Sequence, residues 1–110
     1  MLGIHADGDV KQLAPLIAES GLDFLESYSP PPDNDMPLKE AMQAWPNMSF
    51  FINFPSSVHL CEPEEIYQTA MQIMKDCQGR KMWIQASESV PPGVWKKSYP
   101  EIIRAVEQFR

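Results

Sequence analysis

The sequence has few cysteines, few basic residues and no long apolar run, and each shortage excludes a class of protein. Two cysteines among 110 residues cannot form a disulfide framework, so we expect Cys61 and Cys77 to be reduced. Nine Lys and Arg residues stand against 15 Asp and Glu residues, and the net charge is −6. This balance excludes the basic surface that nucleic acids or acidic membranes require.

No apolar run is long enough to cross a membrane, and neither end carries a secretory leader or a lipidation motif. We therefore expect a cytoplasmic protein with no membrane partner. Hydrophobic residues make up 44% of the chain, which is enough for the core of one small domain. We place that single domain at residues 1–110.

What the sequence does contain is an alternation of strand and helix patterns. Short apolar runs between turn residues predict strands at 2–6, 22–25, 48–54 and 81–86. Helical spacing of apolar residues predicts helices at 10–17, 37–45, 63–77 and 98–109. The first helix is expected to bury Val10, Leu13, Leu16 and Ile17. The last is expected to bury Ile102, Ile103, Val106 and Phe109.

The helix ends carry their own signals. Asp9 precedes the first helix as an N-cap, and Pro63 fits the first turn of the third, for which Cys61 is a candidate N-cap. Ser98 and Glu101 have the spacing of a capping box at the start of the last helix.

The order βαβαβαβα predicts an α/β fold with parallel strands and right-handed crossovers. A complete (β/α)₈ barrel takes about 250 residues, or roughly 31 for each unit. Four units in this chain have about 27 residues each, so we interpret the chain as half of a TIM (β/α)₈ barrel. The alternative is a complete four-stranded open α/β domain.

The long connections, at 26–36, 54–62 and 87–98, all follow strands. In a barrel, the loops that follow strands build the catalytic face. The polar residues near these strand ends are His5, Asp7, Asp9, Glu26, Tyr28, Asn53, Ser56, His59, Gln85, Ser87 and Glu88.

Two stretches near the C-terminus, IQASESVPP at 84–92 and YPEIIRAV at 99–106, resemble the final strand, loop and helix of the uroporphyrinogen decarboxylase superfamily. That superfamily includes cobalamin-dependent and coenzyme M-dependent methyltransferases. The opening IHADGD at 4–9 is similar to its mid-barrel His-x-Cys strand end, and GLDFLE at 21–26 resembles the strand that follows. The resemblance covers the second half of a family member, so it implies a C-terminal half-barrel.

In the methyltransferase branch a zinc ion is held by the His-x-Cys strand end and by a later cysteine. His5 matches the histidine, Asp7 stands at the first thiolate, and Glu88 aligns with the second. His5 and Asp7 are two residues apart on a strand, so both can face the barrel mouth, and one imidazole with two carboxylates suits zinc with an open position. The alternative is a strand-end hydrogen bond for His5, a helix cap for Asp7 or Asp9, and a solvated Glu88.

Other candidate residues lie beside these. Glu26 and Tyr28 are candidates for binding a substrate cation or donating a proton, and the alternative is an exposed loop pair. His59 near Cys61 is a candidate ligand pair or activated thiol, and the alternative is a simple lead into a helix. Trp95, beside two lysines, either covers a ligand or packs on the barrel rim.

Two functions follow. The first is the C-terminal part of a barrel enzyme, in which metal-assisted methyl transfer is favoured over porphyrinogen decarboxylation. The groups that grip the tetrapyrrole carboxylates belong to the family's N-terminal half. The resemblance implies a small-molecule or corrinoid substrate, a coenzyme M-type partner, and an isolated chain without activity. The second is a non-catalytic half-barrel that pairs with itself, or with the missing half, through its strand edges and apolar face.

Overall fold

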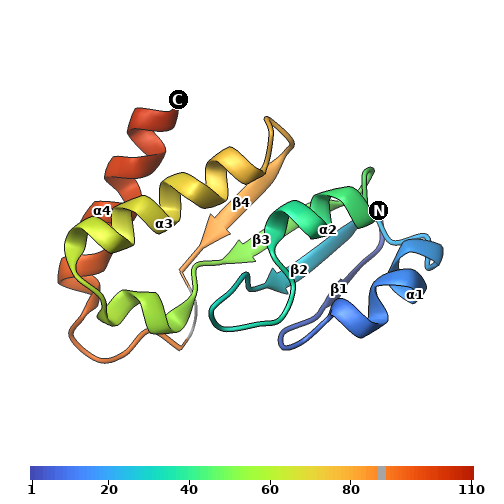
Figure 1. Ribbon diagram of the computed structural model, residues 1–110, viewed down its shortest axis with the longest axis horizontal. Helices are drawn as coiled ribbons and strands as arrows, with labels where there is room; N and C mark the ends of the chain where they lie inside the picture. Colours follow the sequence, from blue (N-terminus) through green and yellow to red (C-terminus); the bar gives the residue numbers. More distant parts are fainter. Residues whose placement is uncertain (87–88) are drawn as a thin grey trace.

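The computed structural model describes residues 1–86 and 89–110, and in this part of the chain four strands alternate with four helices (Figure 1). The strands are β1 (Gly3–His5), β2 (Phe24–Tyr28), β3 (Ser49–Asn53) and β4 (Met82–Gln85). The helices are α1 (Ala14–Glu19), α2 (Leu38–Ala44), α3 (Pro63–Asp76) and α4 (Trp95–Phe109). Two 3₁₀ turns, η1 (Lys11–Leu13) and η2 (Ser56–Leu60), precede α1 and α3.

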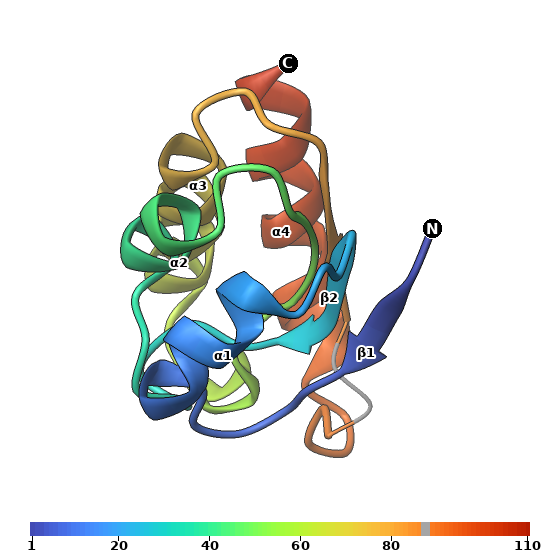
Figure 2. The same ribbon diagram turned by 90° about the vertical axis from the view of Figure 1, so that its right-hand side faces the viewer.

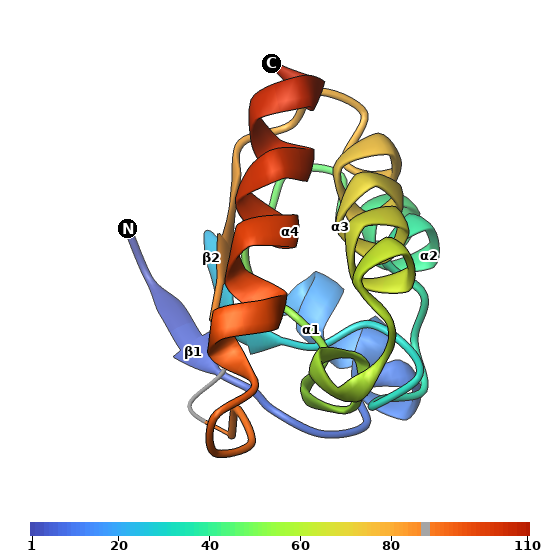
Figure 3. The same ribbon diagram turned by 90° about the vertical axis from the view of Figure 1, so that its left-hand side faces the viewer.

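The four strands form one sheet in chain order, and each pairs in parallel with the next. All four helices lie on one side of this sheet, as the two side views show (Figures 2 and 3). Sequential strands joined by right-handed crossovers produce this one-sided arrangement, whereas a doubly wound sheet has helices on both faces. Four parallel βα units are therefore confirmed. On the other face, no helix from the described ranges covers the strands.

The helix-covered face of the sheet forms the core. Leu25, Phe50 and Ile52 are fully buried there, and α3 covers them with Ile66 and Ala70, which are also fully buried. Successive residues of a strand point to opposite faces, so these side chains come from every second position. Burying side chains of this size contributes about 1.5–3 kcal/mol each.

The opposite face carries an aromatic row, which we define as Phe24, Phe51 and Trp83. Ring centroids of Phe24 and Phe51 lie 5.5 Å apart, and the rings of Phe51 and Trp83 stack at 4.5 Å. The Phe24 ring lies over Gly3, where a Cβ atom would come within 2.3 Å of it. Phe24 and Phe51 are half-buried, and Trp83 is 53% exposed. The aromatic row is packed from strand to strand, and no helix of the described chain packs over it.

The start of the first helix is capped from a distance. The Asp35 carboxylate, in the loop after β2, accepts hydrogen bonds from the backbone N–H groups of Val10 and Lys11 at 3.1 and 3.2 Å. The expected cap, Asp9, is exposed and does not serve this role. Val10 and Asp35 are 25 residues apart, so their contact leaves no local sequence signal. The N-cap was predicted from the residue next to the helix, which is Asp9.

The apolar stripe of the first helix is only half buried. Val10 and Ile17 are buried as expected, but Leu13 is 50% and Leu16 is 66% exposed. Residues 11–13 form a 3₁₀ turn with three residues per turn, so the α-helical spacing does not hold there.

The last helix begins earlier than its predicted capping box. Because α4 starts at Trp95, Ser98 lies inside the helix, fully buried, with its hydroxyl 2.8 Å from His59 Nδ1. The capping-box prediction is therefore wrong. The predicted stripe is also wrong in part, because Ile103 is 55% and Phe109 is 44% exposed. In the described chain, α4 has a packing helix on one flank only.

The third helix follows its sequence signals most closely. Pro63 is its first residue, and Glu62, not Cys61, is its N-cap. The Glu65 carboxylate accepts a hydrogen bond from the Glu62 backbone N–H at 3.3 Å, the reciprocal half of a capping box.

Arg80 joins the amino-terminal end of β3 to the end of α2. Its guanidinium donates hydrogen bonds to the carbonyl oxygens of Met42 at 3.0 Å, Trp45 at 2.9 Å and Met48. These carbonyls end a helix and lead into a strand, so a single side chain holds both elements in place.

Two observations bear on the expected environment of the chain. Cys61 and Cys77 are both free thiols, as predicted. Within residues 1–86 and 89–110, every helix is too short or too polar to cross a membrane.

Candidate functional site

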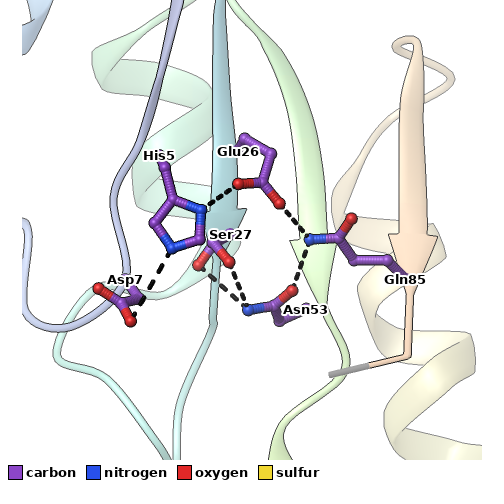
Figure 4. A network of polar contacts seen from close by, with 6 residues as sticks. All are labelled: His5, Asp7, Glu26, Ser27, Asn53 and Gln85. Carbon is purple, nitrogen blue, oxygen red and sulfur yellow. Dashed lines mark hydrogen bonds and ion pairs between the residues drawn. The ribbon is translucent and has the colours of Figure 1, made fainter. Parts of the chain in front are cut away.

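A polar row lies on the uncovered face at the carboxyl ends of the strands (Figure 4). We define it as one residue from each strand, namely His5, Glu26, Asn53 and Gln85. In the sheet register, His5 is opposite Glu26 and Asn53 is opposite Gln85. The polar row therefore follows the aromatic row along the strands, on the same face.

Hydrogen bonds link the polar row from strand to strand. The Gln85 amide nitrogen donates to Glu26 Oε1 at 2.8 Å and to Asn53 Oδ1 at 2.6 Å. The Asn53 amide nitrogen in turn donates to Ser27 Oγ at 3.0 Å. Glu26 Oε2 pairs with His5 Nδ1. Each side chain is held by at least one neighbour, so the row is an ordered surface.

Glu26 is held as a carboxylate. The hydrogen bond from Gln85 lowers the pKa of Glu26 most, the hydrogen bond and charge of His5 lower it further, and partial burial opposes them. An ionised carboxylate can only accept hydrogen bonds, so His5 Nδ1 must carry the proton between them. In the neutral imidazole this leaves the lone pair on Nε2.

The free edge of His5 points toward Asp7 and solvent. Its Nε2 lies 4.0 Å from Asp7 Oδ2, and the side chains of His5 and Asp7 are 56% and 75% exposed. A hollow of about 170 Å³ is lined by His5 and Glu26 together with Ser27, Asn53, Gln85 and Ala86. The hollow is open and polar, and its size suits a small ligand group or a few water molecules.

The structure does not bring Tyr28 together with Glu26. A β-bulge separates them. From Leu25 to Tyr28 strand β2 advances by three positions, while its partner β3 advances by two, from Phe50 to Ile52. Ser27 takes a positive φ of 67° at this point. Tyr28 consequently faces the helices, 1% exposed, and its hydroxyl donates to the Met36 carbonyl. Burial raises the pKa of the Tyr28 hydroxyl well above its usual range.

Of the three predicted zinc ligands, the structure brings two near each other. His5 is the last residue of β1 and Asp7 follows the strand, with its carboxylate 4.0 Å from the imidazole. Glu88 lies outside the described residues. In the described part of the chain, no three His, Cys, Asp or Glu side chains are close enough to hold a metal ion.

His59 is a core residue. It is fully buried, bonds Ser98 and packs edge-on against Phe54 at 5.0 Å between ring centroids. Burial lowers the pKa of His59, so the ring is neutral. Cys61, two residues on, is partly exposed and belongs to the lead into α3.

Trp95 opens α4 and is 50% exposed, with the Lys96 ammonium 5.7 Å from its ring centre. Lys97 turns away to donate to the backbone carbonyls of Leu60 and Cys61 at 3.2 and 2.6 Å. These residues tie η2 to the start of α4.

The sequence showed Asn53 and Gln85 as polar strand ends but gave no reason to join them to Glu26. The signal that links them is the alternation of strand residues between the two faces of the sheet. Asn53 and Gln85 are two positions after Phe51 and Trp83, so each pair shares a face, and this pattern marks an aromatic row followed by a polar row.

Comparisons of the chain with family models, curated proteins and solved structures gave no match.

Proposed function

We propose that this chain supplies four of the eight units of a barrel enzyme, and that the polar row is part of its active-site floor. The observation that carries the proposal is the polar row itself: four hydrogen-bonded side chains, one from each strand, at the carboxyl ends of parallel strands on the face without helices. In (β/α)₈ enzymes the catalytic residues come from these strand ends.

The aromatic row supports the same interpretation. A barrel interior is filled by layers of side chains from neighbouring strands, beneath the site. Phe24, Phe51 and Trp83 form such a layer, directly before the polar row along the strands. In a sheet that worked alone, these three rings would stay in contact with water at a cost of about 25 cal/mol for each Å² of apolar surface.

The chemistry that the floor supports is proton transfer at His5. Its Nε2 lone pair accepts a proton from a thiol or hydroxyl of a bound substrate, while Nδ1–H keeps its bond to Glu26. The Glu26 carboxylate stabilises the imidazolium that results and fixes the ring orientation. Gln85 donates a hydrogen bond to the carboxylate, and Asn53 in turn accepts one from the same Gln85 amide and so fixes its position.

Among the reactions of the family that the sequence resembles, we favour methyl transfer over porphyrinogen decarboxylation. A thiol methyl acceptor of the coenzyme M type must lose its proton, which His5 can accept, and a corrinoid methyl donor needs an apolar wall. A tetrapyrrole needs several cations for its carboxylates. Arg80 is bound to backbone carbonyls at the opposite end of the strands, and Arg104 pairs with Glu101 at 2.6 Å.

A zinc ion would supply Lewis acidity and lower the pKa of a bound thiol. His5 suits it in one respect, since histidine ligands usually donate their second N–H to a carboxylate, as His5 does to Glu26. The described residues still provide only His5 and Asp7, short of the three protein ligands of a catalytic zinc site. We therefore derive no step through a metal.

The experiment is a titration of the chain with coenzyme M, monitored by two-dimensional NMR. We expect shift changes at the polar row, and a Kd about 10-fold weaker in Glu26→Gln because a charged hydrogen bond is lost. Glu107→Gln removes the same charge from an exposed helix position and should leave the Kd unchanged. Shift changes confined to the helices, or equal Kd values in all three proteins, would refute the proposal.

The second candidate is a half-barrel that assembles without catalysis, and the exposure of Trp83 on the uncovered face favours it. The two candidates differ in what His5 does. A purely structural module should tolerate His5→Ala with no change in assembly and bind no probe at the polar row.

A further inference from the structure

The large hydrophobic side chains left exposed are concentrated in the first and last βα units. Nine of the ten lie before residue 17 or after residue 82, and Leu60 is the exception. The nine are Met1, Leu2, Ile4, Leu13, Leu16, Trp83, Trp95, Ile103 and Phe109. Apart from Leu60, the two middle units leave none of their described large hydrophobic side chains in this exposed set. The exposed apolar surface thus marks the two lateral ends of the sheet.

The two ends also carry opposite charge. Residues 1–21, which hold β1 and α1, contain three Asp and Glu against one Lys, a net charge of −2. Residues 82–110, which hold β4 and α4, contain four Lys and Arg against three Glu, a net charge of +1. Contact between the first unit of one chain and the last unit of another therefore brings opposite charges together. Contact between two like ends brings repulsion.

The packing inside the chain shows how such ends fit. Helix α1 contacts α2, α2 contacts α3, and α3 contacts α4, while the parallel strands follow the same order. Each unit therefore presents one flank to the unit before it and the other to the unit after it. The free flank of β4 and α4 is therefore the one against which a further unit, such as β1 and α1, would pack.

A groove at the last unit offers a place for the side chains of α1. It has a volume of about 150 Å³ between β4 and α4, and Ile84, Tyr99, Ile102 and Ile103 give it an apolar lining. On the other end, Leu13 and Leu16 project from η1 and α1 with 50% and 66% exposure. An aliphatic side chain of this size fills such a groove and removes both apolar surfaces from water.

We propose that a second copy of this chain closes the barrel. Strand β4 of each copy pairs in parallel with β1 of the other, and α1 of each copy packs beside α4 of the other. The resulting dimer has twofold symmetry about the barrel axis, with two identical contacts between unlike ends. Its eight strands enclose both aromatic rows, since an eight-stranded barrel is just wide enough for side chains to fill.

The first test measures the mass of the 110-residue chain in solution by light scattering. We expect twice the 12.5 kDa of one chain. A monomer at micromolar concentration, or open-ended aggregates, would overturn the proposal. Leu16→Asp and Ile103→Lys should each weaken the dimer by about 100-fold or more, because each breaks both contacts. Leu60→Asp changes an equally exposed leucine in the middle of the chain and should leave the mass unchanged.

The second test mixes the two weakened variants. In a mixed dimer, one contact sets Asp at 16 against Lys at 103, and the other contact is wild type at both positions. We therefore expect the mixture to regain the dimer mass while each variant alone stays monomeric. A mixture that stays monomeric would overturn the pairing of unlike ends. If like ends met instead, each contact in the mixed dimer would still carry one substituted residue, so mixing would not restore the dimer.

These tests are independent of the proposed chemistry. The substitutions lie on helices outside the polar row, and circular dichroism spectra should match that of wild type because both positions are exposed. A dimer that binds no probe would leave the interface proposal standing and remove the enzyme. A monomer that binds the probe at the polar row would do the opposite.

Discussion

The two faces of the sheet use alternate residues of the same strands, and yet they differ in almost every property. Phe50 is fully buried beneath the helices, while its neighbour Phe51 is half-buried and stacks on the exposed Trp83. Tyr28 bonds a backbone carbonyl on the covered face, while Glu26 joins the polar row on the other. One face is complete within the chain. The other carries ordered rows of side chains over which no described helix packs.

This difference separates stability from function. The covered face holds the fold through burial, so changes there should unfold the protein. The uncovered face is packed only sideways, so changes there should affect binding and assembly. The predictions below set one face against the other, beginning with the largest expected effect.

Phe50→Ala and Phe51→Ala compare adjacent residues of β3 directly. Phe50→Ala leaves a cavity beneath the helices and should lower the free energy of unfolding by about 3–5 kcal/mol. Phe51→Ala removes a half-buried ring and should cost about 1 kcal/mol in the monomeric Leu16→Asp background. Urea unfolding measures both. Equal losses would mean that the uncovered face is part of the core.

Arg80→Ala tests the tie at the amino-terminal end of β3. Three backbone carbonyls lose a charged donor, and the free energy of unfolding should fall by about 2 kcal/mol. Arg110→Ala, at the exposed end of α4, is the matched control and should change little. An unchanged Arg80→Ala protein would show that water replaces the guanidinium without loss.

His59 should make stability depend on pH. Burial lowers its pKa below the ordinary 6.5, so in the window below pH 6.5 the unfolded chain binds a proton that the folded chain does not. Stability from this group is present above pH 6.5 and falls as the pH drops toward the lowered pKa. Urea titrations from pH 8 to pH 5 should show this slope, and His59→Phe should flatten it. A slope retained in His59→Phe would assign it to other groups.

Glu26→Gln should change stability least, by less than about 1 kcal/mol, because the pair with His5 is partly exposed. Because the pKa of Glu26 is lowered, its contribution is present above pH 4.5 and is lost as the pH falls. The clearer result is the His5 tautomer, which should shift from Nδ1–H toward Nε2–H in nitrogen NMR spectra. His59, bonded to Ser98, is the internal control. An unchanged His5 spectrum would contradict the pairing.

Much of the fold could be predicted from local signals. Strand and helix order followed from apolar spacing, and Pro63 marked the start of α3 at its first residue. The errors arose where contacts between residues far apart in the sequence determine the local structure. Asp35 caps the first helix from 25 residues away, and Ser98 sits inside α4 because it meets buried His59. No spacing rule contains such contacts.

The sequence named the polar residues that follow the strands, and the structure places His5 Nε2 4.0 Å from Asp7 Oδ2. Glu26 and Tyr28 were expected just after the second strand, but both lie in β2, and the bulge at Ser27 turns Tyr28 to the opposite face. A bulge adds one residue to a strand without a reliable sequence signal, so only the structure reveals it. The link from Gln85 to Glu26 spans 59 residues and also requires the sheet register.

The most direct test of the proposed assembly is amide hydrogen exchange of the strands, in wild type and in Leu16→Asp. If the two free ends meet in a second copy, amides in β1 and β4 should exchange as slowly as those in β3 in wild type, and much faster in the variant. Equal exchange in the two proteins, with fast edges in both, would mean that this sheet is complete as it stands.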